Sequence, residues 1–182
     1  MEGGYLELIL GPMFSGKTTK LVNLYHKYVK LSYKVVAINY FKDTRYSDEK
    51  LSTHDNIMIP CIFANSISST LDRDCVKEAD VVLINEGQFF DDILESTLFL
   101  IEKMNKQVFV CGLDGDFKRQ KFGNLLDLLP YSDELVKLKS ICKICKNNAI
   151  FSHRISKESE QLVIGSDNYV PLCRKCYLNE NK

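Results

Sequence analysis

At residues 11–18 the sequence reads Gly11-Pro12-Met13-Phe14-Ser15-Gly16-Lys17-Thr18, which matches the pattern G-x-x-x-x-G-K-[ST] at every fixed position. A short apolar run, Tyr5–Leu10, comes directly before it, and apolar residues recur at helical spacing over Thr18–Leu31. Another apolar run follows at Lys34–Asn39, so the segment predicts a strand–turn–helix–strand unit. Such units build parallel sheets with right-handed crossovers. The expected fold is therefore α/β, a P-loop NTPase-like, mainly parallel sheet flanked by helices.

A loop of this kind binds the phosphates of a nucleoside triphosphate. Glycines let consecutive backbone N–H groups curve around a phosphate without Cβ clashes, and the helix N-terminus adds partial positive charge. Lys17 brings a full charge to the β- and γ-phosphates, and Thr18 offers a hydroxyl oxygen to Mg²⁺. A chance match in a turn is the alternative, which the flanking strand and helix disfavour. The motif alone does not say where the phosphoryl group goes.

The remaining chain divides into an α/β part and a cysteine-rich part. Because cysteines and turns replace buried strands after residue 140, we expect a nucleotide-binding domain over 1–140, a zinc-binding domain over 141–178 and a frayed tail over 179–182. Phe41–Asn56 is polar and predicted to be a loop. The expected strands are Ile57–Phe63, Val81–Ile84, Gln107–Leu113 and Leu135–Lys139, and the expected helices run from Asp91 to about Met104 and from Asn124 to Leu129, the latter stopped by Pro130.

Glu86 is the only carboxylate at the end of the strand Val81–Ile84. P-loop enzymes carry an acidic residue at the end of a neighbouring strand, close to the magnesium ion. At the carboxyl end of a parallel strand, Glu86 would lie in the crevice above the sheet and could accept a proton from a substrate hydroxyl. A magnesium ligand or a surface carboxylate is the alternative.

Four of the seven cysteines, Cys142, Cys145, Cys173 and Cys176, form two C-x-x-C pairs. This spacing suits a tetrahedral thiolate zinc site, and four thiolates leave no open position, so the zinc would be structural. A redox pair or two unrelated turns are the alternatives, and His153 could compete as a ligand. Between the pairs we expect a hairpin of Ala149–Ile155 with Gln161–Ile164. The other cysteines, Cys61, Cys75 and Cys111, are predicted to be buried thiols.

Charge and hydropathy argue against two classes of partner, nucleic acid and membrane. The 24 basic and 24 acidic residues cancel, so no broad positive field is available for nucleic acid. No apolar stretch approaches the roughly 20 residues of a membrane helix. The N-terminus lacks the features of a signal peptide. We expect no nucleic-acid or membrane partner, and a cytoplasmic location, where cysteines stay reduced.

Taken in order along nearly the whole chain, these features resemble the type II thymidine kinases. The P-loop and the cysteine pairs are each shared by many proteins, but their combination with Glu86-Gly87-Gln88-Phe89-Phe90 is specific. The further landmarks are Lys42-Asp43-Thr44-Arg45-Tyr46, Thr53-His54-Asp55, Leu113-Asp114-Gly115-Asp116-Phe117 and Cys173-Arg174-Lys175-Cys176-Tyr177.

The resemblance implies an ATP-dependent nucleoside kinase that phosphorylates the 5′-hydroxyl of thymidine, giving dTMP and ADP. It implies structural Zn²⁺, Mg²⁺ bound with ATP, a homotetramer and feedback inhibition by dTTP. Glu86 corresponds to the proton acceptor, and Arg45 would face phosphates. The implied thymidine contacts are Phe117, with Met13, Phe89, Leu113 and Phe122 as pocket walls, and a lasso of Gln161, Leu162, Val163, Ile164, Gly165 and Tyr169, whose backbone would hold the thymine.

Two departures from the family pattern bear on function. The family usually has Asp where this chain has Asn85, and an amide binds Mg²⁺ or its water shell less strongly than a carboxylate. The stretch Gly165–Tyr169 is one residue shorter than the animal and poxviral pattern. A catalytically impaired nucleotide-binding relative and a zinc-ribbon ATPase stimulated by nucleic acid are the alternative functions.

Overall fold

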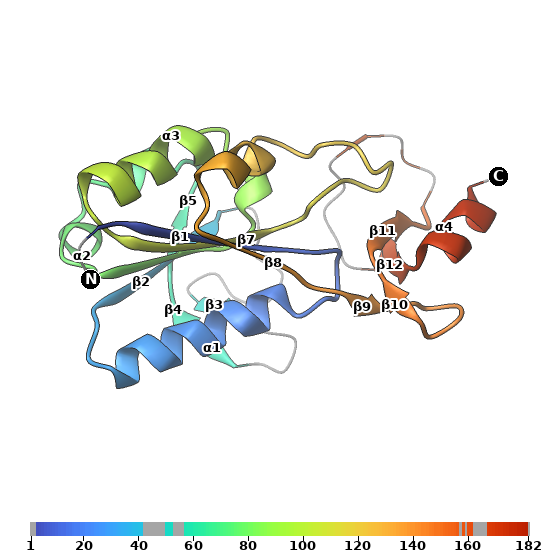
Figure 1. The fold of residues 1–182 in the computed structure, drawn as a ribbon, viewed down its shortest axis with the longest axis horizontal. Coiled ribbons are helices and arrows are strands. Elements are labelled where there is room, and N and C mark those ends of the chain that lie inside the picture. Colours follow the sequence, from blue (N-terminus) through green and yellow to red (C-terminus); the bar gives the residue numbers. More distant parts are fainter. Residues whose placement is uncertain are drawn as a thin grey trace.

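The protein is built around one parallel β-sheet of six strands (Figure 1). The computed structural model describes residues 3–41, 50–52, 57–156, 158, 160–161 and 167–181. The strand order is β5-β2-β6-β7-β1-β8, and every neighbouring pair runs parallel. The predicted fold class is confirmed. The strands are β1 (Tyr5–Leu10), β2 (Val35–Tyr40), β5 (Ile62–Ala64), β6 (Val81–Ile84), β7 (Gln107–Gly112) and β8 (Glu134–Lys137).

Helices cover both faces of the sheet, because the strands are apolar on both faces. In β1, Leu6, Leu8 and Leu10 enter one core and Ile9 enters the other, as the two-residue period of a strand requires. The core of Ile9 is covered by α1 (Lys17–Lys30). The opposite core is covered by α3 (Ile93–Leu98), by its π-helical extension η3 (Phe99–Lys103) and by the 3₁₀ helix η4 (Leu125–Tyr131). Three shorter elements are η1 (Ser68–Thr70), α2 (Asp74–Lys77) and η2 (Gly87–Phe89).

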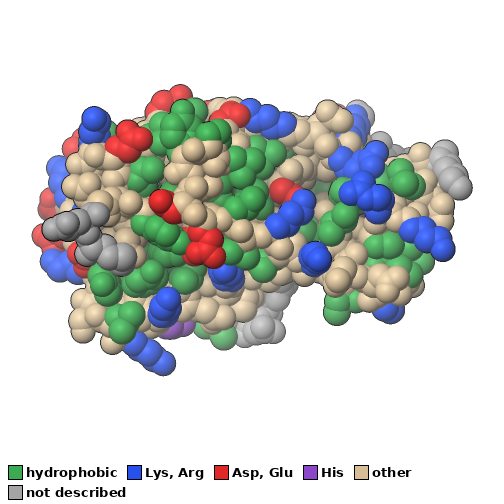
Figure 2. All heavy atoms as spheres, viewed as in Figure 1, with side chains coloured by type: hydrophobic (Ala, Val, Ile, Leu, Met, Phe, Trp, Pro, Cys, Tyr) green, Lys and Arg blue, Asp and Glu red, His purple; other side chains and the backbone are tan. Residues whose placement is uncertain are grey.

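The C-terminal residues form a small lobe at one end of the sheet (Figure 1). Its own core consists of Cys142, Ala149, Leu172, Cys176 and Tyr177. Among the charged side chains on its visible surface, Lys and Arg predominate, whereas both signs of charge are interspersed over the rest of the view (Figure 2). The lobe contains the antiparallel pairs β9 (Ser140–Ile141) with β10 (Asn148–Ala149) and β11 (Phe151–Arg154) with β12 (Tyr169–Leu172), followed by α4 (Arg174–Glu180).

Several local predictions were wrong. Lys50–Ser52 is a strand, β3, in the predicted loop; it pairs with β4 (Met58–Pro60), and Leu51 is buried in the core under α1. The predicted strand Ile57–Phe63 is two strands in different sheets, β4 and β5. Pro130 lies inside η4 rather than ending it, because a short 3₁₀ helix has few hydrogen bonds for a missing N–H to break.

The predictions for the C-terminal lobe and for the single cysteines also need correction. The partner of β11 is β12, because the Tyr169–Leu172 run supplies the buried side chains that close the lobe. The predicted partner residues 162–164 lie outside the described residues. Of the single cysteines, Cys111 is buried as expected, but Cys61 is half-buried and Cys75 is exposed on α2. Among the helices of the described residues, none combines the length and apolar character needed to cross a bilayer.

Candidate active site and metal centre

The loop between β1 and α1 has the backbone that its glycines predict. Gly16 has a φ of +81°, a left-handed conformation that favours glycine. A Cβ at Gly11 would lie 2.8 Å from the carbonyl oxygen of Leu138, so this position has no room for a side chain. Gly16 is also the N-cap of α1 and offers no side-chain cap, which makes an anion the natural partner of this helix terminus.

Polar groups inside the loop have the arrangement of a phosphate cradle. The Lys17 side chain is buried and folds back over the loop, where its Nζ donates to the carbonyl of Pro12 at 2.8 Å. Ser15 Oγ is one of the buried side-chain oxygens, within the described residues, that lack a hydrogen-bond partner. An orphaned hydroxyl in the same loop as a buried cation fits a loop that binds an anionic ligand.

The C-terminal lobe holds the same loop in place. The backbone N–H of Met13 donates to Ser152 Oγ at 2.9 Å, and Ser140 Oγ donates to the carbonyl of Phe14 at 2.9 Å. Phosphate loop and lobe are therefore tied together by hydrogen bonds from residues more than a hundred positions apart in sequence.

Glu86 follows β6 in a strained conformation. Its φ of 55° and ψ of 44° are left-handed, which costs a non-glycine residue roughly 1–3 kcal/mol and is typical of functional sites. Gln88 Nε2 donates to Glu86 Oε2 at 2.6 Å, while Gln88 Oε1 accepts the N–H of Leu113 at 3.0 Å. The expectation that the acidic strand is next to β1 is wrong: β7 lies between β6 and β1.

Asn85 is buried in the sheet with both ends of its amide paired. Its Nδ2 donates to Asn39 Oδ1 at 2.8 Å, and its Oδ1 accepts from Cys111 Sγ at 2.9 Å. The departure from Asp thus coincides with an amide partner on β2 and a thiol partner on β7, the two strands beside β6.

Two of the expected pocket aromatics lie together near Glu86. The rings of Phe89 and Phe122 meet edge to face with centroids 5.4 Å apart, and the Tyr40 ring packs at a tilt against that of Phe89 with centroids 5.2 Å apart. Phe122 belongs to the long connection between β7 and η4, residues 113–124. Both ends of this connection lie against Gln88. At its start the Leu113 N–H donates to the Gln88 side chain, and near its end Gly123 is so close that a Cβ there would collide with the Gln88 carbonyl.

The tip of the same connection reaches the C-terminal lobe and carries Phe117. Asp116 Oδ1 accepts the N–H groups of Lys118 and Gln120, both at 2.8 Å, which fixes the turn. Asp116 Oδ2 accepts from Gln161 Nε2 at 2.8 Å. Tyr177 donates its hydroxyl to the carbonyl of Phe117 at 2.6 Å. Phe117 and Gln161, predicted from distant segments, are therefore neighbours.

Tyr169 joins this second group through Arg154, which donates to its hydroxyl and lies over the ring of Phe117. The remaining predicted residues are accounted for as follows. Met13 and Leu113 lie half-buried at the phosphate loop and beside Gln88, respectively. Arg45, Leu162, Val163, Ile164 and Gly165 lie outside the described residues.

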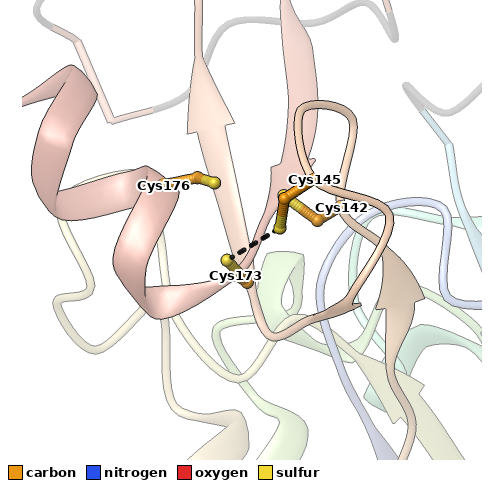
Figure 3. Close-up of side chains that lie close together, drawn as sticks. All are labelled: Cys142, Cys145, Cys173 and Cys176. Carbon is orange, nitrogen blue, oxygen red and sulfur yellow. Dashed lines mark hydrogen bonds between the residues drawn. The ribbon is translucent and has the colours of Figure 1, made fainter.

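The four paired cysteines converge on one centre (Figure 3). Their Sγ atoms all lie within 4.8 Å of one another, and those of Cys145 and Cys173 are 3.5 Å apart. A tetrahedral zinc site with Zn–S bonds of about 2.3 Å needs sulfurs about 3.8 Å apart, so the cluster fits zinc. His153 is not part of it: its ring packs against Tyr177 and its Nδ1 meets Asn181 Nδ2 at 3.2 Å.

The electrostatics of the cluster also favour a bound cation. Burial raises the pKa of the Cys142 thiol, but the backbone N–H groups of Cys145 and Cys173 outweigh it and lower this pKa to about 6. Burial and the neighbouring thiols raise the pKa of Cys176 to about 12. Four thiolates this close can ionise together only when a cation compensates their charge.

Sequence reasoning missed the residues that hold the site residues in place: Gln88, Asp116, Ser152 and Arg154. Gln88 and Asp116 belong to the motifs Glu86–Phe90 and Leu113–Phe117 that resemble the family, so these motifs could have indicated them. Ser152 and Arg154 carried none, because an isolated polar residue in a short strand reads as a solvated one. Both are buried, with 4% and 5% of their surface exposed.

A parallel sheet with this phosphate loop and a four-cysteine centre defines an α/β protein of the P-loop type that can hold a structural metal. The chain belongs to the thymidine kinase family, whose model matches residues 4–177.

Relatives named thymidine kinase match over nearly their full length. That of Yaba monkey tumor virus is 44% identical over 181 residues, 99% of this chain and 98% of its own. That of sheeppox virus is 38% identical over 99% of this chain and 100% of its own. That of vaccinia virus (strain Western Reserve) is 40% identical over 98% of this chain and 99% of its own. A structural match to domain III of the Thermotoga maritima replication initiation protein DnaA covers 73% of this chain and 54% of that chain, at 16% identity and a TM-score of 0.43.

Proposed function

We propose that this chain transfers the γ-phosphoryl group of ATP to the 5′-hydroxyl of thymidine, giving dTMP and ADP. The observation that carries the proposal is the strained Glu86, held by Gln88 at the carboxyl edge of the sheet that also presents the phosphate loop. The names of the relatives support the choice of thymidine as the acceptor.

In this mechanism Glu86 accepts the proton of the 5′-hydroxyl while the hydroxyl oxygen bonds to the γ-phosphorus and the bond to the β,γ-bridging oxygen breaks. Phosphoryl transfer passes through a loose transition state, so positioning and charge neutralisation do most of the work. Residues 11–18 hold the triphosphate, and Lys17 exchanges its contact with Pro12 for the β- and γ-phosphates. Thr18 would offer its hydroxyl to the Mg²⁺ that accompanies ATP, and the ion would neutralise phosphate charge.

The base pocket is proposed to lie between the aromatic residues and the lasso. Phe117 is the central aromatic, and Met13, Phe89, Leu113 and Phe122 form further walls. Thymine presents an acceptor, a donor and another acceptor along one edge, which main-chain groups of the lasso can match. Cytosine would leave buried polar groups unpaired, which is costly. The lasso residues are Gln161, Leu162, Val163, Ile164, Gly165 and Tyr169, and Arg45 is proposed to face phosphates.

A structural Zn²⁺ on Cys142, Cys145, Cys173 and Cys176 would fix the ends of this lasso. We also propose that the nucleotide-binding and zinc-binding domains meet near residue 140. The protein is proposed to act in the cytoplasm, where thiols stay reduced. A homotetramer and inhibition by dTTP are supported by the family resemblance alone, and sedimentation with and without dTTP tests them.

The test is phosphorylation of a nucleoside panel with labelled ATP and Mg²⁺, using the wild type, Glu86→Gln and the control Glu95→Gln on the exposed surface of α3. We expect thymidine to be the preferred acceptor. Glu86→Gln should lose about 10²–10⁴-fold in kcat with ATP affinity retained, and the control should match the wild type. Near-normal turnover by Glu86→Gln would refute its role as the base. Absence of any nucleoside monophosphate product from the zinc-loaded wild type would favour an impaired relative instead.

A further inference from the structure

Arg154, at the end of β11, is a buried cation that links three separate segments of the chain. Only 5% of its surface is exposed. Its guanidinium donates to the carbonyls of Glu158 at 3.0 Å and Gln161 at 2.9 Å, and also to that of Glu160. Both Nε, at 3.1 Å, and one terminal nitrogen donate to the Tyr169 hydroxyl. A buried charge is tolerated only when its donors are satisfied, and here backbone carbonyls and a phenol satisfy them.

The face of the guanidinium is used as well as its edge. The central carbon of Arg154 lies 3.8 Å from the centroid of the Phe117 ring and 5.1 Å from that of Tyr169. A cation this close to an aromatic face is attracted to it, most strongly away from water. Arg154 therefore sets the position of Phe117 by stacking and the positions of three main-chain carbonyls, those of Glu158, Glu160 and Gln161, by hydrogen bonds.

We propose that Arg154 is the positioning residue of the nucleoside side of the site, holding Phe117 and both ends of the lasso in one arrangement. This inference rests on the proposed function. Lysine cannot replace it, because an ammonium group lacks the planar fork that reaches several carbonyls at once and stacks on a ring.

Ser152 provides a matched comparison on the same strand. Ser152 and Arg154 are the two buried residues of β11, two positions apart, and therefore face the same side. Ser152 contacts the phosphate loop through the N–H of Met13, whereas Arg154 contacts the nucleoside side. General loosening of β11 would weaken the binding of both substrates in either variant. A positioning role instead predicts that substitution of Arg154 weakens mainly thymidine binding and substitution of Ser152 weakens mainly ATP binding.

The experiment compares Arg154→Lys, Ser152→Ala and the wild type by KM for thymidine, KM for ATP and zinc content. We expect Arg154→Lys to raise the thymidine KM about tenfold or more and to leave the ATP KM within about twofold, with zinc retained. Ser152→Ala should affect the ATP KM more than the thymidine KM. An unchanged thymidine KM in Arg154→Lys, or an equal rise of both constants in both variants, would overturn the proposal.

Amide hydrogen exchange gives a readout that does not depend on turnover. In Arg154→Lys, exchange should accelerate in peptides that carry Phe117 and Gln161 and stay unchanged in α1. If the wild type failed to phosphorylate thymidine, the proposed function would fall, and this exchange pattern would still decide whether Arg154 orders these segments. Unaltered exchange at Phe117 and Gln161 would refute the positioning role.

Discussion

Gln88 lies two residues after Glu86 and donates its amide to the Glu86 carboxylate at 2.6 Å. The other end of the same amide accepts the Leu113 N–H, so the candidate base is fixed to the connection that carries the pocket aromatics. A glutamine in this position couples the orientation of Glu86 to the end of β7.

Gly112→Ala tests this coupling without touching Glu86. A Cβ at Gly112 would overlap Gln88 Oε1 and the Leu125 side chain, so Gln88 must move. We expect kcat for thymidine phosphorylation to fall by about tenfold or more, with ATP affinity retained. The control is Gly115→Ala, whose Cβ would meet no described heavy atom closer than 3.4 Å. Equal activity of the two variants would contradict the coupling.

Asn85→Asp places a carboxylate between an amide and a thiol inside the sheet. Neither Asn39 nor Cys111 supplies a positive charge, so we expect the free energy of unfolding to fall by roughly 1–3 kcal/mol at pH 7. Adding Asn39→Lys should restore part of that loss by supplying a counter-charge. Urea unfolding of the single and double variants measures both effects, and an Asn85→Asp protein as stable as the wild type would show that the pair tolerates charge.

Cys173→Ser should abolish metal binding and weaken thymidine binding more than ATP binding. Cys173 is the N-cap of α4, and Tyr177 on that helix holds the carbonyl of Phe117. We expect about one zinc ion per chain in the wild type and little in the variant, measured by metal analysis beside both KM values. Cys75→Ser, at an exposed cysteine outside the cluster, is the control and should retain the metal. Full zinc content in Cys173→Ser would argue against a four-thiolate site.

Asp92 should make stability depend on pH in the acid range. Burial raises the pKa of its carboxyl, but the N–H groups of Ser68 and Ile67, at 2.7 and 3.1 Å, outweigh burial and lower it. A lowered folded-state pKa means that the stabilisation is present above the unfolded value of about 3.9 and disappears as the pH falls through the folded value. Asp92→Asn should therefore lower the free energy of unfolding by about 1–2 kcal/mol at pH 7, as measured by urea unfolding. This loss is smaller than a fully buried site would give, because Asp92 is partly exposed to solvent.

Near pH 3, the difference in the free energy of unfolding between Asp92→Asn and the wild type should become smaller. Asp91→Asn changes an exposed neighbouring carboxylate and should leave stability unchanged at both pH values. A difference between Asp92→Asn and the wild type that grows as the pH falls would contradict the assigned sign.

The sheet and the phosphate loop could be predicted because their signals are local. The β1 segment is apolar on both faces, and the glycines of residues 11–16 mark the turn before α1. Leu51 in β3 could not be recognised, because a three-residue strand is stabilised by tertiary burial rather than by its own pattern. Likewise, the missing N–H of Pro130 is a weaker stop signal in a 3₁₀ helix than in an α-helix.

The candidate site divides in the same way. Glu86 and the four cysteines stood out because their residue types and spacing imply chemistry. Arg154 did not, because its partners are backbone carbonyls at Glu158, Glu160 and Gln161, whose positions depend on the folded path of the chain. Residue types in a sequence can predict side-chain chemistry, but they do not show which main-chain carbonyls will lie within hydrogen-bond distance of a side chain.

The insertion of β7 between the strands of the phosphate loop and of Glu86 has a geometric consequence. Neighbouring strands lie about 4.8 Å apart, so the two strand ends are separated by roughly 10 Å. That span accommodates two reactants end to end, the tail of a nucleotide and the alcohol of a second molecule. The width of the sheet edge is therefore compatible with a second bound molecule between the phosphate loop and the carboxylate that follows β6.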